Sequence, residues 1–215
     1  MTCLVLGATG SLGNGLATAL RESGEKVIGV ARGPQPASVS TDGWIQVADY
    51  ADFEPNGIEW TRAFLAFGAF LQAPILDSTE AEISEQIHAN LTSQILVVRR
   101  LLGTLNRVES RRRDIVLVGS TSAYTGFGGS SVYCASKFGL RGFVESMNAE
   151  WSSSNVRFWL ASMGSMDNAM GRRVPNVRQD HLLSPLEVAR DIVRVVVRDT
   201  SAFQPEIVIR RRWIP

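Results

Sequence analysis

The chain has 215 residues, and its 22 Lys and Arg against 21 Asp and Glu leave a net charge of +1. This balance gives no electrostatic basis for binding nucleic acid. Hydrophobic residues make up 45% of the chain, yet no apolar run is long enough to cross a bilayer, so we expect a soluble globular protein with no membrane partner. The length favours one domain over residues 1–215.

The cysteine content indicates a reducing compartment. Cys3 and Cys134 are too few for a disulfide framework and lack the spacing of metal ligands, so we expect free thiols and no metal. The apolar run that starts at residue 3 leaves no room for a cleavable signal, and we therefore expect a cytoplasmic protein. The basic runs at 111–113 and 210–212 are expected to be solvated.

The first third of the chain predicts a βαβ unit followed by two further strands. Strands are expected at 2–7, 26–32, 44–49 and 62–68, and a helix at 11–24. The stretch 50–61 contains Pro55 and Gly57 and is too short for a full crossover helix.

The rest of the chain continues the alternation of helix and strand. Helices are expected at 77–105, 131–151 and 184–197, and strands at 114–120, 155–162 and 206–210. Asp77 or Ser78 is the expected N-cap of the first of these helices, and Ser184-Pro185 opens the last. The pattern predicts an α/β, single-domain Rossmann fold, with a doubly wound parallel sheet of about seven strands and helices on both faces.

The segment GATGSLG at 7–13 joins the first strand to the first helix. Gly7, Gly10 and Gly13 allow a sharp turn, the close approach of a phosphate and close packing of the helix on the sheet. The N–H groups and the dipole at the helix start favour a pyrophosphate. A tight turn without a ligand is the alternative, but the position within a βαβ unit indicates a dinucleotide site.

The end of the second strand selects between the two dinucleotides. An acidic residue there would bind a ribose 2′-hydroxyl, whereas an arginine would bind a 2′-phosphate. The chain has Arg32 at this point and no acidic residue before Asp42, so NADP(H) is favoured and NAD(H) is the alternative. A solvated Arg32 on a loop would leave the preference undecided.

Four polar residues converge on the crevice at the strand ends. Tyr133 and Lys137 are four apart and project from one face of a predicted helix. Ser120 ends a strand, and Asn90 lies within the preceding long helix, where asparagine has a poor propensity. Each has an ordinary alternative as a solvated pair, a strand-end cap or a polar residue between packed helices, and Ser122 is the alternative serine.

The order and spacing of GATGSLG, Asn90, Ser120 and YCASK at 133–137 resemble the short-chain dehydrogenase/reductase family over nearly the whole chain. The interval from Ser120 to Tyr133 is similar to that of its 3-oxoacyl carrier-protein reductases. The resemblance implies a catalytic tetrad. Tyr133 would be the general acid in reduction, Ser120 would bind the substrate carbonyl, and Lys137 would bind the nicotinamide ribose. Asn90 would hold a water behind Lys137.

The chemistry of a tyrosine acid sets one expectation for this tetrad. A phenol titrates near pH 10 in water, which is too high for easy proton exchange near neutrality. We expect the nearby ammonium of Lys137, together with a bound oxidised nicotinamide, to lower the pKa of Tyr133.

The resemblance also implies a set of cofactor contacts. These are Gly7, Thr9, Gly10, Ser11, Leu12, Gly13, Arg32, Asp49, Gly68, Tyr133, Lys137 and Gly164. At three places the sequence of this chain departs from the pattern of the family. Ser11 occupies the place of a glycine, Leu65-Ala66-Phe67-Gly68 loses both amides of the usual Asn-Asn-Ala-Gly, and Met163-Gly164 replaces Pro-Gly.

A substrate loop is expected at about 165–183. Met163, Met166 and Met170 would either line an apolar substrate pocket or pack the loop down. The loop also carries Arg172, Arg173 and Arg178. Solvation of these arginines is favoured over contact with an acidic substrate or carrier protein.

These features predict an NADPH-dependent oxidoreductase that moves hydride between the nicotinamide and a small-molecule carbonyl or secondary alcohol. The alternatives are a dinucleotide-binding regulatory or structural protein without turnover, and an NAD-dependent epimerase or dehydratase. The resemblance further implies a homodimer or homotetramer.

Overall fold

The computed structural model describes residues 1–105, 111–174, 177–198 and 203–211. Seven strands form one sheet in the order β3-β2-β1-β4-β5-β6-β7, and every neighbouring pair is parallel. The strands are β1 (Thr2–Leu6), β2 (Lys26–Ala31), β3 (Gly43–Gln46), β4 (Arg62–Leu65), β5 (Arg113–Val118), β6 (Val156–Met163) and β7 (Glu206–Ile209). The expected doubly wound sheet is confirmed.

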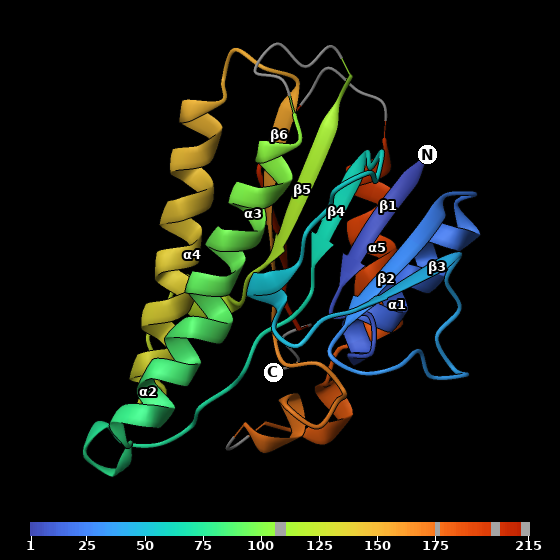
Figure 1. The fold of residues 1–215 in the computed structure, drawn as a ribbon. Coiled ribbons are helices and arrows are strands. Elements are labelled where there is room, and N and C mark those ends of the chain that lie inside the picture. The colour runs from blue at the N-terminus through green and yellow to red at the C-terminus, as the bar shows by residue number, and fades with distance from the viewer. Residues whose placement is uncertain (106–110, 175–176, 199–202, 212–215) are drawn as a thin grey trace.

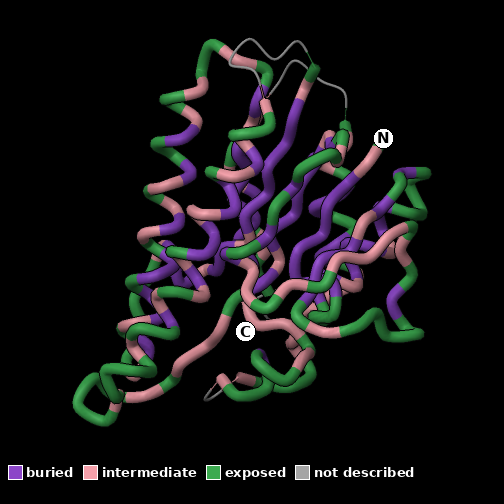
Figure 2. Tube along the Cα trace, viewed as in Figure 1, coloured by how far each residue is buried: buried purple, intermediate pink, exposed green. Residues whose placement is uncertain are grey.

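Helices cover both faces of this sheet (Figure 1). On one side lie α1 (Ser11–Glu22) and α5 (Pro185–Val197), and on the other α2 (Glu80–Ile87), α3 (Ser93–Gly103) and α4 (Ser131–Glu150). Successive side chains of a strand point to opposite faces, so Val5 joins the core under α1 and α5 while Leu4 and Leu6 join the core under α3 and α4. The buried strands form the centre of the molecule in Figure 2.

The strand order reverses between β1 and β4. From β1 the chain passes through α1 to β2 on one side, whereas β4 pairs with the other side of β1. A crevice opens at such a point, outside the carboxyl ends of the strands. No helix of the described residues is long and apolar enough to pass through a bilayer.

The long helix expected at 77–105 differs from the structure in two ways. The expected N-cap, Asp77 or Ser78, is wrong, because α2 begins after Thr79. Thr79 Oγ1 accepts from Glu82 N at 3.2 Å and Glu82 Oε2 accepts from Thr79 N at 2.9 Å, and this reciprocal pair fixes the start. Residues His88–Thr92 then form a π-helical turn between α2 and α3, centred on Asn90.

The connection between β3 and β4 contains only a short 3-10 turn, Tyr50–Asp52, as the Pro and Gly content of 50–61 predicted. The short connection leaves Tyr50 near the carboxyl ends of the strands, where it lines the crevice described below.

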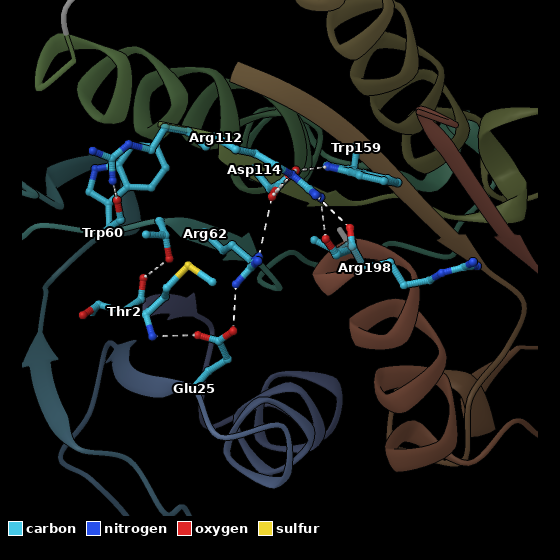
Figure 3. A network of polar contacts seen from close by, with 12 residues as sticks. Thr2, Glu25, Trp60, Arg62, Arg112, Asp114, Trp159 and Arg198 are labelled. Carbon is cyan, nitrogen blue, oxygen red and sulfur yellow. Dashed lines mark hydrogen bonds and ion pairs between the residues drawn. The ribbon is translucent and has the colours of Figure 1, made fainter. Parts of the chain in front are cut away.

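The amino edge of the sheet holds a buried network of charges (Figure 3). Arg62 Nη1 lies 2.9 Å from Glu25 Oε1, and Arg62 Nε lies 3.6 Å from Asp114 Oδ2. Asp114 also meets Arg112 Nε at 2.9 Å and accepts from Trp159 Nε1 at 2.9 Å. The network links β4, β5, β6 and the start of β2.

The expectation that 111–113 are all solvated is wrong for two of the three residues. Arg112 donates to the carbonyls of Val196 at 2.6 Å and Arg198 at 2.8 Å, at the end of α5. Arg113 is buried and donates to the carbonyl of Trp60. The several N–H donors of an arginine side chain let these two residues satisfy backbone carbonyls that would otherwise lack a partner.

Candidate active site

The glycine turn forms a cradle at the end of β1. Gly7 has φ +88°, and a Cβ at this position would lie 2.6 Å from the carbonyl oxygen of Ala66. Gly10 N donates to Gly7 O at 2.9 Å, and Gly10 directly precedes α1. Because the first N–H groups of a helix have no intrahelical partners, α1 offers donors to a phosphate at this point. Any side chain at position 7 would therefore clash with the backbone of Ala66.

A cleft of about 1160 Å³ runs along the carboxyl ends of the strands. Among the residues that line it are Gly7, Thr9, Gly10, Ser11, Leu12, Arg32, Asp49, Gly68, Asn90, Ser120, Tyr133, Lys137 and Gly164. The cleft is large enough for a dinucleotide with a small substrate beside it. A glycine cradle, a helix start and an arginine within one cleft fit a nicotinamide dinucleotide.

Gly13 is the predicted residue that the structure does not bring to the cleft. A Cβ on Gly13 would lie 2.1 Å from Gly7 O, so this glycine lets α1 pack against the turn. Its place in the fold is that of the third glycine in the motif, which serves packing.

The end of the cleft at β2 and β3 contains a stacked pair of aromatic residues that no sequence motif indicated. Tyr50 stacks on Phe67, with ring centroids 4.2 Å apart and an interplanar angle of 14°. The guanidinium carbon of Arg32 lies 6.0 Å from the centroid of the Tyr50 ring. The two rings come from segments after β3 and β4, which meet only because the sheet brings their ends together.

Asp49 is held by its neighbours at the same end of the cleft. Its Oδ1 accepts from Ala51 N at 2.8 Å, and this bond lowers the pKa of the carboxyl group. Its Oδ2 lies 2.9 Å from His88 Nε2, which also lies 3.1 Å from Ser93 Oγ. His88 lines the cleft and was missed, because its partner is 39 residues earlier in the chain.

Tyr133 and Lys137 project from the first turns of α4 into the cleft, beside Ser120 at the end of β5. Lys137 Nζ lies 5.9 Å from the centroid of the Tyr133 ring and donates to Val118 O at 2.9 Å. The Tyr133 and Lys137 residues are only 8% and 4% exposed. Ser122 also lines the cleft, but its N–H donates to Ser120 Oγ at 3.1 Å.

Burial controls the titration of this pair. It raises the pKa of Tyr133, and a hydrogen bond with Ser120 lowers that pKa by less. Burial also lowers the pKa of Lys137 to about 8. In the chain alone the pKa of Tyr133 is therefore raised, because the loss of hydration is the larger effect, and the lowering by Lys137 together with a bound oxidised nicotinamide stays a prediction.

Asn90 lies at the π-helical turn and is fully buried. Its Oδ1 accepts from Ala69 N at 2.7 Å, and its Nδ2 donates to Ala69 O at 3.0 Å and to Ser136 Oγ at 3.1 Å. A Cβ on Gly68 would lie 2.6 Å from Asn90 Oδ1 and 3.9 Å from Lys137 Nζ. Asn90 thus fixes the backbone beside Lys137, and π-turns frequently occur at such functional positions.

Two glutamines, one helical turn to either side of Asn90, also hydrogen-bond through their side-chain amides to the backbone of the segment after β4. Gln86 Oε1 accepts from Leu71 N at 2.5 Å and Gln86 Nε2 donates to Ala69 O at 3.0 Å, while Gln94 Nε2 donates to Phe67 O at 2.9 Å. The segment after β4 lacks the two side-chain amides of the family pattern, and its backbone is hydrogen-bonded instead by the side-chain amides of Gln86 on α2 and Gln94 on α3. Both glutamines were missed, because their partners lie 15 to 27 residues away.

The expected substrate loop borders the other end of the cleft. Met163, Met166 and Met170 line it, as does Arg178, whereas Arg172 forms an exposed ion pair with Asp167. Residues 175–176 of the loop and Arg212 lie outside the described residues. Arg210 and Arg211 are exposed as expected but also line the cleft.

The chain is similar in sequence to known proteins. The sequence profile of the short chain dehydrogenase family matches residues 67–178. A sepiapterin reductase of Chlorobaculum tepidum is 28% identical over 134 residues, 62% of this chain and 54% of the relative, so the chain spans about half of that protein. A 3-oxoacyl-[acyl-carrier-protein] reductase of Buchnera aphidicola is 25% identical over 94% of this chain and 88% of its own length.

A solved structure shares the fold. The alcohol dehydrogenase from the archaeon Thermococcus sibiricus, complexed with 5-hydroxy-NADP, superposes with a TM-score of 0.80 at 17% identity. The match covers 96% of this chain and 94% of that one. With the family profile matching more than half of its residues, the chain belongs to the short-chain dehydrogenase/reductase family of nicotinamide-dependent oxidoreductases.

Proposed function

We propose that the protein is an NADPH-dependent oxidoreductase that moves hydride between the nicotinamide and a carbonyl or secondary alcohol, with Tyr133 as the acid and base. The observation that carries the proposal is the meeting of Ser120, Tyr133 and Lys137 in one cleft with the glycine cradle. When bound, the nicotinamide supplies or accepts the hydride.

In reduction, the new C–H bond forms at the carbonyl carbon and the electron pair of the C=O bond moves to oxygen. The hydroxyl of Tyr133 donates its proton to that oxygen, and Ser120 Oγ donates a hydrogen bond to the same atom as its charge grows. Burial raises the pKa of Tyr133, so its hydroxyl is protonated before the reaction, and transfer of the proton near neutrality requires that the phenolate be stabilised as it forms. The ammonium of Lys137 stabilises the phenolate that remains.

The backbone around Lys137 holds its ammonium where it can stabilise the phenolate of Tyr133. Its ammonium is anchored on Val118 O, and the Gly68 backbone that Asn90 holds lies next to it. Asn90 is therefore a positioning residue in the proposal. Its side-chain amide is occupied by the Ala69 backbone and Ser136.

The preference for NADP(H) over NAD(H) rests on Arg32, which follows β2 and lines the cleft. The first acidic residue after β2, Asp42, accepts from Val27 N at 2.8 Å and forms an ion pair with Arg21 at 3.3 Å. It is thus held away from a ribose hydroxyl. The NADP analogue bound by the Thermococcus sibiricus enzyme is in line with this choice.

The proposal also includes a cytoplasmic, single-domain subunit over 1–215 that forms a homodimer or homotetramer. Phe138 on α4 is 45% exposed, and pairing of two copies through this helix would cover it. Light scattering coupled to size exclusion would show a single species of two or four subunits. A monomer at micromolar concentration would contradict this part.

The test of the activity is a reductase assay with a panel of ketones and aldehydes, followed by the absorbance of NADPH. We expect NADPH oxidation that depends on the carbonyl compound, and formation of NADPH from NADP⁺ with the matching secondary alcohol. Tight NADPH binding without turnover of any substrate would instead indicate a dinucleotide-binding regulatory protein. Turnover with retained cofactor and no net reduction would indicate an epimerase.

A further inference from the structure

One aromatic side chain stands directly against the proposed acid. The rings of Phe70 and Tyr133 have centroids 4.9 Å apart and an interplanar angle of 90°. Phe70 is half-buried and lines the cleft. It follows β4 in the segment that departs from the family pattern, so no role comes to it from the resemblance.

Phe70 is held in this position by the buried helix amides. Gln86 bonds the backbone on both sides of it, at Ala69 O and Leu71 N, and Asn90 bonds Ala69 at both N and O. Gln86 and Asn90 are 2% and 0% exposed. A segment that is tied at the residues before and after Phe70 presents its ring as a fixed wall of the cleft.

A second phenylalanine approaches from the loop before α4. A Cβ on Gly129 would lie 3.7 Å from Gln72 Nε2, so the segments around 70–72 and 127–129 lie next to each other. Phe127 is 53% exposed and lines the cleft. Two aromatic side chains therefore lie on neighbouring segments on the side of the cleft that contains Tyr133.

Apart from Lys137, whose ammonium lies 5.9 Å from the centroid of the Tyr133 ring, the cations that line the cleft come from other segments of the chain. Arg210 and Arg211 follow β7, three strands from β4, which is about 14 Å at the usual strand spacing. Arg178 is paired with Asp180 at 2.6 Å. The side chains of Phe70 and Phe127 thus form an uncharged, aromatic wall near Tyr133, and Met166 and Met170 add adaptable apolar surface.

Resting on the proposed function, we propose that the substrate is a neutral carbonyl compound with an aryl or conjugated group next to the carbonyl carbon, and that Phe70 selects it. A flat group beside the carbonyl packs against the fixed ring of Phe70 while the oxygen reaches Tyr133. Aromatic pairs are favourable beyond the area they bury, whereas a saturated ring of the same size lacks this contribution.

The test compares phenyl methyl ketone with cyclohexyl methyl ketone, which differ mainly in the flatness of the ring. We expect Phe70→Leu to lower the ratio of kcat/KM for the phenyl over the cyclohexyl ketone by about 3- to 10-fold relative to the unmodified protein. Gln86→Leu, which frees the segment, should lower the same ratio and raise KM more than it lowers kcat. Phe203→Leu is the matched control, because Phe203 makes an equivalent edge-on pair with Trp159 at 4.8 Å outside the cleft.

The outcomes separate the two proposals. An unchanged ratio in Phe70→Leu, with both ketones still reduced, would overturn the selection by Phe70 and leave the reductase activity standing. An equal loss for both ketones would also overturn it, because Phe70 would then support Tyr133 rather than the substrate. If neither these ketones nor any other carbonyl compound consumed NADPH, the proposed function would fall and this inference with it.

Discussion

Charged side chains are buried at both the amino and the carboxyl ends of the strands, which we call the amino edge and the carboxyl edge of the sheet, but of the residues that the structure describes only those at the amino edge have oppositely charged partners. At the amino edge, Glu25, Arg62 and Asp114 are at most 9% exposed, and each has an oppositely charged partner within 3.6 Å. At the carboxyl edge, Lys137 is 4% exposed, and within the described ranges no carboxylate forms an ion pair with it. Its ammonium has the carbonyl of Val118 instead, and the pKa of Lys137 falls to about 8.

The difference separates charges that maintain the fold from charges that are available for chemistry. In a buried ion pair each charge compensates the other, and removal of either partner leaves an uncompensated buried charge that destabilises the fold. A buried cation without a carboxylate costs free energy in the folded state and titrates near neutrality, which is the property expected of a functional group. We therefore interpret the network in Figure 3 as structural, and the cleft is where we propose that catalysis occurs.

The largest effect on stability is expected at the amino edge. Arg62→Met leaves Glu25 and Asp114 buried with fewer cations, and we expect the free energy of unfolding to fall by about 3–5 kcal/mol. Urea unfolding followed by circular dichroism measures this change. Activity per folded molecule should remain, because Arg62 does not line the cleft.

The matched control for that variant is Arg190→Met. Arg190 also pairs with a glutamate, Glu22, at 2.8 Å, but it does so on the surface between α1 and α5. Exposed pairs contribute little, so the midpoint of unfolding should stay within error. Equal losses in the two variants would show that burial does not distinguish these pairs.

The next effect concerns Lys137 and has a defined pH dependence. The pKa of Lys137 is about 8 in the folded chain and 10.5 in the unfolded chain, so the unfolded chain binds more protons between these values. Stability should therefore rise with pH in this window, by on the order of 3 kcal/mol at most. The difference in free energy of unfolding between the natural protein and Lys137→Met should move in favour of the natural protein as pH rises from 8 to 10.5.

Urea unfolding of both proteins at several pH values measures that difference. Below pH 8 it should be flat, because Lys137 is protonated in both the folded and the unfolded chain. A difference that stays constant up to pH 10.5 would mean that Lys137 keeps an ordinary pKa, and the contrast between the edges would be lost.

The smallest effect is expected at Arg32, a second cation at the carboxyl edge without an ion pair in the described part of the chain. Arg32→Asp should weaken NADPH binding by about 10- to 100-fold, the value of a charged hydrogen bond to phosphate, and should leave NADH binding less affected. Fluorescence titration with both cofactors measures the change. If the ratio of the two affinities is unaltered, Arg32 does not contact the 2′-phosphate.

Local sequence was sufficient for the parts of the site that depend on short spacing. GATGSLG folds as a turn and helix start, and the interval of four between Tyr133 and Lys137 places both on one face of α4. Side chains also alternate along the central strands, and this divides the buried residues between the two cores. In each case the structure follows from helix or strand periodicity.

The parts that could not be predicted depend on contacts between distant segments. Gln86 and Gln94 have ordinary propensities for a helix interior, and only the packing of α2 and α3 against the segment after β4 gives their amides a role. The helix begins after Thr79, and not after Asp77 or Ser78, because Thr79 and Glu82 form a reciprocal pair of hydrogen bonds. Arg113 was expected in solvent because its carbonyl partner at Trp60 lies 53 residues earlier.

The central claim is that the hydroxyl of Tyr133 carries the proton in hydride transfer, and single-turnover reduction by Tyr133→Phe tests it most directly. The variant keeps the ring that packs on Phe70 and removes only the proton donor. We predict that the rate of hydride transfer falls by about 100- to 10,000-fold while the dissociation constant of NADPH stays within a few-fold of the unmodified protein. A variant that binds NADPH and transfers hydride at an undiminished rate would contradict the account.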